Sequence, residues 1–219
     1  MRSIWRFIAW PALLTLGVTL LRLFAELNSL APALANRDGG GPMALIGIVW
    51  LVFVFGAWFG WRLAQSGRGP GRPGRVVLVH VLAIGGAAAA AAIGLRFVAF
   101  PEIVLVNGAS YAVAAAVAWR AWPEMARLNL AYGIAARIPV VIVTLIAVPM
   151  AWGTHYEKIG FGDGIELAAA PRMLWLCGAQ IVVWLPFTVL FGGLSGGIAA
   201  VIAARGRTGL SSAAAAAHD

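Results

Sequence analysis

The feature that most constrains this chain is a series of long apolar runs, each close to the length that crosses a lipid bilayer. A transmembrane helix needs about 20 consecutive, mostly apolar residues. The charged fraction is 11%, compared with about 25% in soluble domains, and the mean hydropathy is +0.89. A soluble fold of 219 residues could not hide so much apolar surface, so we expect the solvent of this chain to be lipid.

Six runs reach this length, which predicts an all-α, polytopic bundle of six transmembrane helices. They cover residues 4–26, 43–65, 76–98, 101–121, 124–151 and 172–203. Proline supports the start of four of them, because its missing N–H would have no partner in a first helical turn. These four prolines are Pro42, Pro101, Pro123 and Pro171. We treat residues 1–207 as a single six-helix domain and expect the low-complexity tail, 208–219, to be disordered in the cytoplasm.

Arginine sets the expected direction of the bundle. It accounts for 15 of the 16 basic residues and lies mostly in alternate connections. One set of connections contains Arg2, Arg6, Arg62, Arg68, Arg72, Arg75, Arg120, Arg127, Arg205 and Arg207. The positive-inside rule places this set, and with it both termini, in the cytoplasm. The same topology explains the net charge of +8 without nucleic acid. We therefore expect a multi-pass protein of a bacterial-type cytoplasmic (inner) membrane, with the lipid bilayer as its partner.

Small residues gather where helices would have to approach each other closely. They include Gly56 and Gly60, the segment 85–94 (GGAAAAAAIG) and the segment 192–197 (GGLSGG). In lipid, small side chains allow close contact between helix backbones. Such faces fit packing within the chain, and they also fit a homo-oligomer or a partner in a membrane complex. The one cysteine, Cys177, excludes an internal disulfide, and no particular cofactor or metal site is indicated.

The stretch 193–196, GLSG, resembles the serine motif of rhomboid intramembrane proteases. That resemblance implies a serine nucleophile at Ser195 and a histidine base on a later helix. Here the motif lies in the last apolar run, and the later histidine is His218 in the tail. A nucleophile without a base within reach is not activated, so we exclude a rhomboid-type site.

The most informative polar residue is Arg137, in the middle of the fifth run and two positions before Pro139. It lies roughly 20 Å along the helix from Glu124, near the midplane, where an arginine costs at least about 2.5–3.5 kcal/mol. Asn107 and Gln180 fall in the outer half of their runs. The outer ends also hold Glu26, Glu102 and the outer-loop residue His155. We predict that these six residues surround an outward-facing polar pocket.

Structural roles remain open for each of these residues. Arg137 could be a tether paired with Glu26 or Glu102, and Glu26 has the i,i+4 spacing to pair with Arg22. Asn107 and Gln180 fit interhelical hydrogen bonds. His155 and Glu157 are too few for a metal site, which usually takes three or four protein ligands.

Two classes of function follow from this pattern. The first is a small transporter, channel or binding protein whose anionic or polar ligand meets Arg137 from outside. The second is a membrane-embedded enzyme acting on a lipid or isoprenoid, with His155 or Glu102 as the acid–base group. An accessory subunit of a membrane complex is a third expectation. The lack of a nucleophile–base pair and the scarcity of polar groups in the inner half favour a binding or gated role.

Overall fold

The computed structural model describes residues 4–30, 35–37, 47–99, 102–159 and 167–216, with side chains as far as residue 206. Within these residues the chain is all-helical and has no strand. The elements are α1 (Trp5–Leu27), α2 (Val49–Gln65), α3 (Pro73–Phe97), α4 (Glu102–Ala121), α5 (Pro123–Met150), the 3₁₀ turn η1 (His155–Glu157), α6 (Ala169–Ala179), the π-helical segment η2 (Gln180–Trp184) and α7 (Leu185–Ala216).

Five helical stretches are long and apolar enough to cross a membrane. Four are α1, α3, α4 and α5, and the fifth is the continuous helix Ala169–Gly206, made of α6, η2 and most of α7. The expected second span is shorter, because α2 has 17 residues and the start of the 43–65 run lies outside the described residues. The last helix is longer than 172–203. It extends to Ala216, inside the 208–219 tail that the composition predicts to be disordered.

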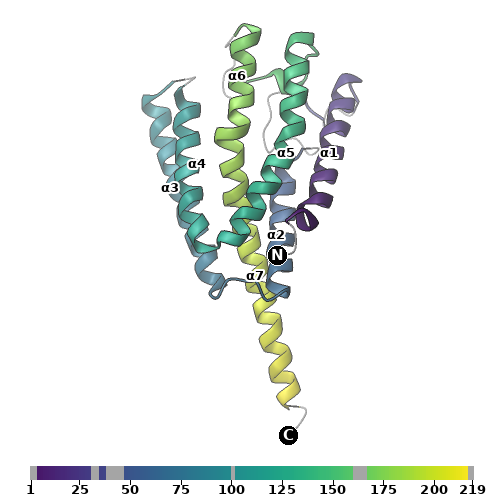
Figure 1. Cartoon of the computed structure of the whole chain (residues 1–219). Coiled ribbons are helices and arrows are strands. Elements are labelled where there is room, and N and C mark those ends of the chain that lie inside the picture. The colour runs from purple at the N-terminus through teal and green to yellow at the C-terminus, as the bar shows by residue number, and fades with distance from the viewer. Residues whose placement is uncertain (1–3, 31–34, 38–46, 100–101, 160–166, 217–219) are drawn as a thin grey trace.

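Consecutive helices run in opposite directions (Figure 1). The C-terminal ends of α2 and α4 lie at one end of the bundle, and those of α1, α3 and α5 lie at the other. Proline occupies the first turn of α3 and of α5, at Pro73 and Pro123. Further along α5, Pro139 and Pro149 lie inside the helix, yet α5 remains one helix of 28 residues. It ends at Met150 and is capped by Ala151, which adopts a left-handed conformation with φ 50°.

One half of the bundle is closely packed, at the end where α2 meets α7. An ideal Cβ placed on Gly60 would lie 2.2 Å from the carbonyl oxygen of Gly196, and one on Gly56 would lie 2.5 Å from that of Gly192. These glycines therefore serve contact within the chain, since only a hydrogen fits between the two backbones. Around this contact the core is filled by large side chains from α1, α2 and α5, among them Ile8, Phe55, Phe59, Leu63, Met125 and Tyr132.

The part of the bundle formed by α3, α4 and α6 has a different packing. The neighbours α3 and α4 lie side by side as a hairpin (Figure 1), and a second core cluster of mainly small residues joins them to α7. By contrast, α6 and η2 run between this hairpin and α5, and neither contains a buried residue. The inner face of α6 and η2 therefore borders a space and not a packed core.

Candidate functional site

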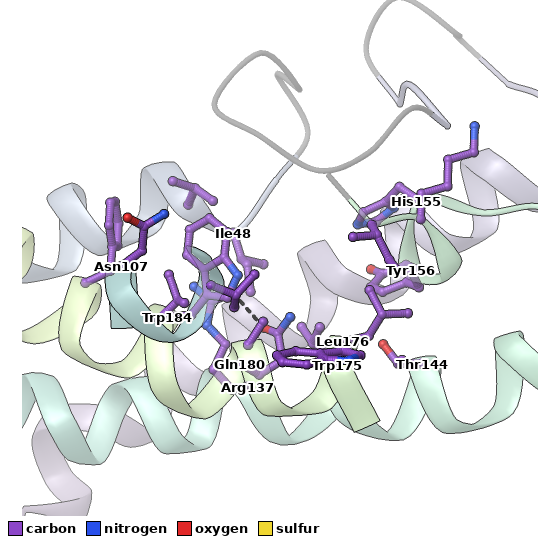
Figure 2. Close-up of a pocket in the computed structure, with 18 of the residues that line it drawn as sticks. Ile48, Asn107, Arg137, Thr144, His155, Tyr156, Trp175, Leu176, Gln180 and Trp184 are labelled. Carbon is purple, nitrogen blue, oxygen red and sulfur yellow. Dashed lines mark hydrogen bonds between the residues drawn. The ribbon is translucent and has the colours of Figure 1, made fainter. Parts of the chain in front are cut away.

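A pocket of about 510 Å³ lies against α5, α6 and η2 in the loosely packed half (Figure 2). Its walls come from α1, the first turn of α2, the facing ends of α3 and α4, the middle of α5, and η1. The polar and charged side chains that line it are Thr19, Arg22, Asn107, Tyr111, Arg137, Thr144, His155, Tyr156, Lys158 and Gln180. Aliphatic and aromatic residues supply the rest of the wall. No acidic residue of the described chain lines the pocket, so its charge is positive.

Arg137 is a buried charge in the wall of this pocket. The residue is 7% exposed, and it lies midway along α5. Its Nη1 donates to Oε1 of Gln180 at 3.4 Å, a long and therefore weak hydrogen bond. The guanidinium carbon lies 4.8 Å from the ring centroid of Trp184, a cation–π contact. The buried Nε has no hydrogen-bond partner among the described residues. The cation is thus held by an amide dipole and an aromatic face, and one of its donors is unpaired.

The local geometry of η2 brings both neighbours to Arg137. Gln180 and Trp184 begin and end the π-helical segment, which lies just before Pro186. Proline has no N–H to donate to the residue four positions earlier, and its ring clashes with that residue's carbonyl, so the turn widens. The freed carbonyl belongs to Val182, and its oxygen packs within 2.9 Å of an ideal Cβ on Gly108 of α4. The absence of a side chain at Gly108 lets α4 accept this wider turn.

The expectation that Glu26 or Glu102 neutralises Arg137 is wrong. Glu26 Oε1 accepts from Nε of Arg22 at 2.7 Å and from Nδ1 of His155 at 2.5 Å. Its Oε2 accepts from the backbone N–H of His155 at 2.9 Å. Glu102 is exposed at the start of α4 and does not line the pocket. The alternative pairing of Arg22 with Glu26, expected from the i,i+4 spacing, is confirmed. Among the described residues, Arg137 therefore has no ion pair.

The Arg22–Glu26–His155 cluster lies at the pocket mouth and ties α1 to η1. Glu26 is completely covered on its side chain, whereas Arg22 and His155 reach the pocket. Burial lowers the pKa of His155 below its ordinary value, and the hydrogen bond that His155 donates to Glu26 offsets this in part. Because Arg22 already neutralises Glu26, a charged His155 would leave an excess buried cation. The imidazole is therefore neutral at pH 7, with its Nδ1–H donated to Glu26.

Four of the six predicted site residues share the pocket, namely Arg137, Asn107, Gln180 and His155. Asn107 projects from α4, and its buried Oδ1 has no hydrogen-bond partner among the described residues. The expected interhelical hydrogen bond of Gln180 exists, with Arg137 as donor. Glu26 lies behind the wall and positions Arg22 and His155. Glu102 takes no part in the site.

Sequence reasoning missed three contributors. Trp184 stacks on Arg137, and Trp175 lines the wall, although such tryptophans are usually read as belt residues at the membrane interface. The useful signal was the spacing of Gln180, Trp184 and Pro186, since a proline two residues after a polar–aromatic pair indicates a widened turn. Arg22 was the third, because its pairing with Glu26 obscured its second role at the pocket mouth.

The GLSG segment is a packing element. Ser195 Oγ donates to the carbonyl of Gly192 at 3.1 Å, and it lies 2.4 Å from an ideal Cβ on Gly56 of α2. His80 of α3 is 3% exposed, and its Nδ1 lies 2.8 Å from the carbonyl oxygen of Val76. Its Nε2 packs on Gly193. His80 is therefore buried between α3 and α7.

The described residues contain no group of three or more histidine, cysteine or acidic side chains that could hold a metal ion. Comparison with protein-family models, with curated proteins and with solved structures finds no match for this chain.

Proposed function

We propose that this membrane-protein bundle binds an anionic ligand in its pocket, with Arg137 as the counter-charge. One observation carries the proposal, namely that the guanidinium lies buried at a pocket wall, has no ion pair among the described residues, and keeps Nε unpaired. Leaving one charge of a buried pair without its partner costs on the order of 3–5 kcal/mol. A ligand carboxylate or phosphate would supply both the opposite charge and the missing acceptor.

The proposed direction of entry is from outside the cell. It rests on the arginine-rich connections after α2 and α4, which place the opposite end, and the pocket with it, on the outer side. Beyond Arg137, towards the proposed inner side, the bundle is closed by Tyr132, Phe55 and Phe59, whose rings pack edge to face. This arrangement supports a binding protein or a gated transporter over an open channel.

The test compares Arg137→Gln with Arg96→Gln after purification from bacterial membranes. Arg96 is an exposed arginine of α3 that does not line the pocket, so its loss removes the same charge elsewhere. Native mass spectrometry should show bound anionic adducts on the wild-type protein and on the Arg96 variant. Arg137→Gln should lower their occupancy about 10- to 100-fold, because charged hydrogen bonds contribute roughly 1.5–3 kcal/mol. Identical adducts on all three proteins would contradict the proposal.

A second candidate function is acid–base catalysis on a ligand held in the same pocket. It is favoured by His155, whose Nδ1 is oriented by a buried carboxylate while the ring borders the pocket. This is the arrangement that prepares a histidine for proton transfer. With the ligand identified, His155→Gln separates the two functions. Loss of turnover with retained binding would indicate an enzyme, whereas unchanged chemistry would leave binding alone.

A further inference from the structure

Apart from Arg137, the pocket has an apolar wall formed by α6 and η2, and this wall also restricts the kind of ligand. The inner faces of α6 and η2 contribute Trp175, Leu176, Ala179, Val183 and Trp184 to the lining. None of these residues is buried, although α6 lies between the α3–α4 hairpin and α5. In a bundle of this size, a helix so placed normally buries an apolar stripe against its neighbours. Here the apolar stripe faces the pocket, so an apolar body is needed to cover it.

The opposite wall is apolar as well and reaches the outer surface of the bundle. Val98 and Leu95 from the end of α3 and Val104 from α4 line the pocket. Leu95 is 65% exposed, which places the rim of the pocket at the lipid-facing side of α3. Val18 of α1, a helix that packs mainly on α5, also lines the pocket. Both α1 and α3 therefore contribute apolar side chains to the pocket lining.

Polar groups also line the pocket beside these apolar walls. Arg137, Gln180 and Asn107 come from three different helices, and two of them carry a buried atom without a hydrogen-bond partner among the described residues. In a guanidinium, Nε and Nη2 form the edge that binds a carboxylate or phosphate through two parallel hydrogen bonds. Gln180 uses Nη1 instead, so it leaves this edge to the ligand.

We infer that the ligand is a membrane amphiphile, namely a long apolar chain with one anionic head, carboxylate or phosphate. Its head binds Arg137, and its chain lies along α6 and leaves towards lipid between α1 and α3. This inference deepens the proposed function and rests on it. A volume of about 510 Å³ is in the range of pockets for whole organic molecules, roughly 300–1,000 Å³, and exceeds the need of an inorganic anion.

The experiment separates charge from chain length with three probes. The full chain is placed in phosphatidylcholine nanodiscs at pH 8 and titrated with oleate, with oleyl alcohol, and with acetate, and binding is read by native mass spectrometry. Oleate should bind at least about tenfold more tightly than either partial mimic, because it alone supplies both the charge and the chain. Arg137→Gln should remove that preference, and Arg96→Gln should keep it.

A second pair of variants tests the chain-binding wall and leaves the charge intact. Ala179→Trp fills the pocket from α6, whereas Leu174→Trp adds the same ring on the exposed outer face of α6, at a residue that is 73% exposed. Ala179→Trp should weaken oleate binding at least about tenfold while keeping the wild-type thermal midpoint without ligand. Leu174→Trp should bind oleate like the wild type. These variants also carry the test if Arg137→Gln does not fold.

The outcomes distinguish the claim that Arg137 binds an anion from the claim that the ligand is an amphiphile. Acetate binding as tight as that of oleate, and dependent on Arg137, would overturn the amphiphile and leave the anion site standing. Oleate binding that is unchanged by both Arg137→Gln and Ala179→Trp would overturn both claims. Oleyl alcohol binding like oleate would place the chain in the pocket but remove the anionic head.

Discussion

At the scale of single residues, Arg22 and Arg137 are both buried but have opposite electrostatic environments. Arg22 is neutralised by Glu26 within one helix, and His155 completes the set of donors around that carboxylate. Arg137 receives an amide oxygen and an aromatic face. The first arrangement is self-sufficient and stabilises the fold. The second is electrostatically incomplete, which is why Arg137, and not Arg22, identifies the ligand site.

Removing the Glu26 carboxylate should be costly, because it leaves Arg22 buried without its counter-charge. We expect Glu26→Ala to lower the free energy of unfolding by about 3–5 kcal/mol. Glu102→Ala is the matched control, since that glutamate is exposed, and its effect should stay within about 0.5 kcal/mol. Denaturant titration in detergent measures both, and equal effects would contradict a structural role for the cluster.

The neutral state of His155 predicts a pH dependence of stability. Its folded pKa is lowered by burial, so below about pH 6.5 the unfolded chain takes up a proton more readily than the folded one. This contribution is fully present above that pH and declines as the pH falls towards the folded pKa. The thermal midpoint should therefore drop between pH 7.5 and pH 5.5, and the drop should be smaller in His155→Asn. An equal drop in the variant would assign the effect to other groups.

The site residues differ in how far sequence alone could predict them. The pairing of Arg22 with Glu26 follows from helical spacing, and the burial of Arg137 follows from the cost of a charge in lipid. The contact between Glu26 and His155 spans 129 positions and depends on how the η1 turn folds back on α1. No periodicity encodes that return, which is why the sequence leaves the partner of Glu26 open between Arg22 and Arg137.

At the scale of helices, the contact of α2 with α7 explains the small residues that occur on both segments. The sequence shows small residues on both segments but does not say which helices they join. Their pairing depends on the whole arrangement of the bundle, which places Gly56 and Gly60 against Gly192 and Gly196. The π-helical form of the turn before Pro186 likewise depends on tertiary packing, because the widened turn needs the space that Gly108 provides on α4.

A single methyl group tests the α2–α7 contact. Gly60→Ala would place a carbon against the backbone of Gly196, so the helices must separate, and we expect a loss of about 1–3 kcal/mol. Gly85→Ala is the matched control, because nothing lies within 4 Å of its ideal Cβ. It should be neutral or stabilise the helix by up to about 1 kcal/mol. Similar midpoints for both variants in denaturant titrations would show that α2 and α7 are not in close contact.

At the scale of the whole molecule, the bundle is closely packed at the end where α2 meets α7, and it contains a pocket beside α5, α6 and η2. The alternation of helix directions agrees with the alternating arginine connections. The orientation in the membrane remains a prediction and follows from the positive-inside rule. Because the pocket and the arginine-rich connections lie at opposite ends, fixing the orientation also fixes the side from which a ligand has access.

Cysteine accessibility measures that orientation. With Cys177 replaced by alanine, a membrane-impermeant maleimide should label Leu30→Cys in intact spheroplasts. Leu30 follows α1 and is exposed. A cysteine at Gly71, between α2 and α3 with nothing within 4 Å of its ideal Cβ, should react only after the membrane is permeabilised. The reverse pattern would invert the topology and make the pocket face the cytoplasm.

The cation–aromatic pair of Arg137 and Trp184 also has a consequence for biosynthesis. Arg137 is made 43 residues before Gln180, an interval of about 2–9 s at 5–20 residues per second. During that time α5 presents a bare charge, so we expect it to stay beside the insertion machinery until α6 emerges. Crosslinks from α5 to that machinery, in nascent chains stalled before α6 leaves the ribosome, should be stronger than in the same chains carrying Arg137→Leu. Equal crosslinking would show that α5 enters lipid without waiting.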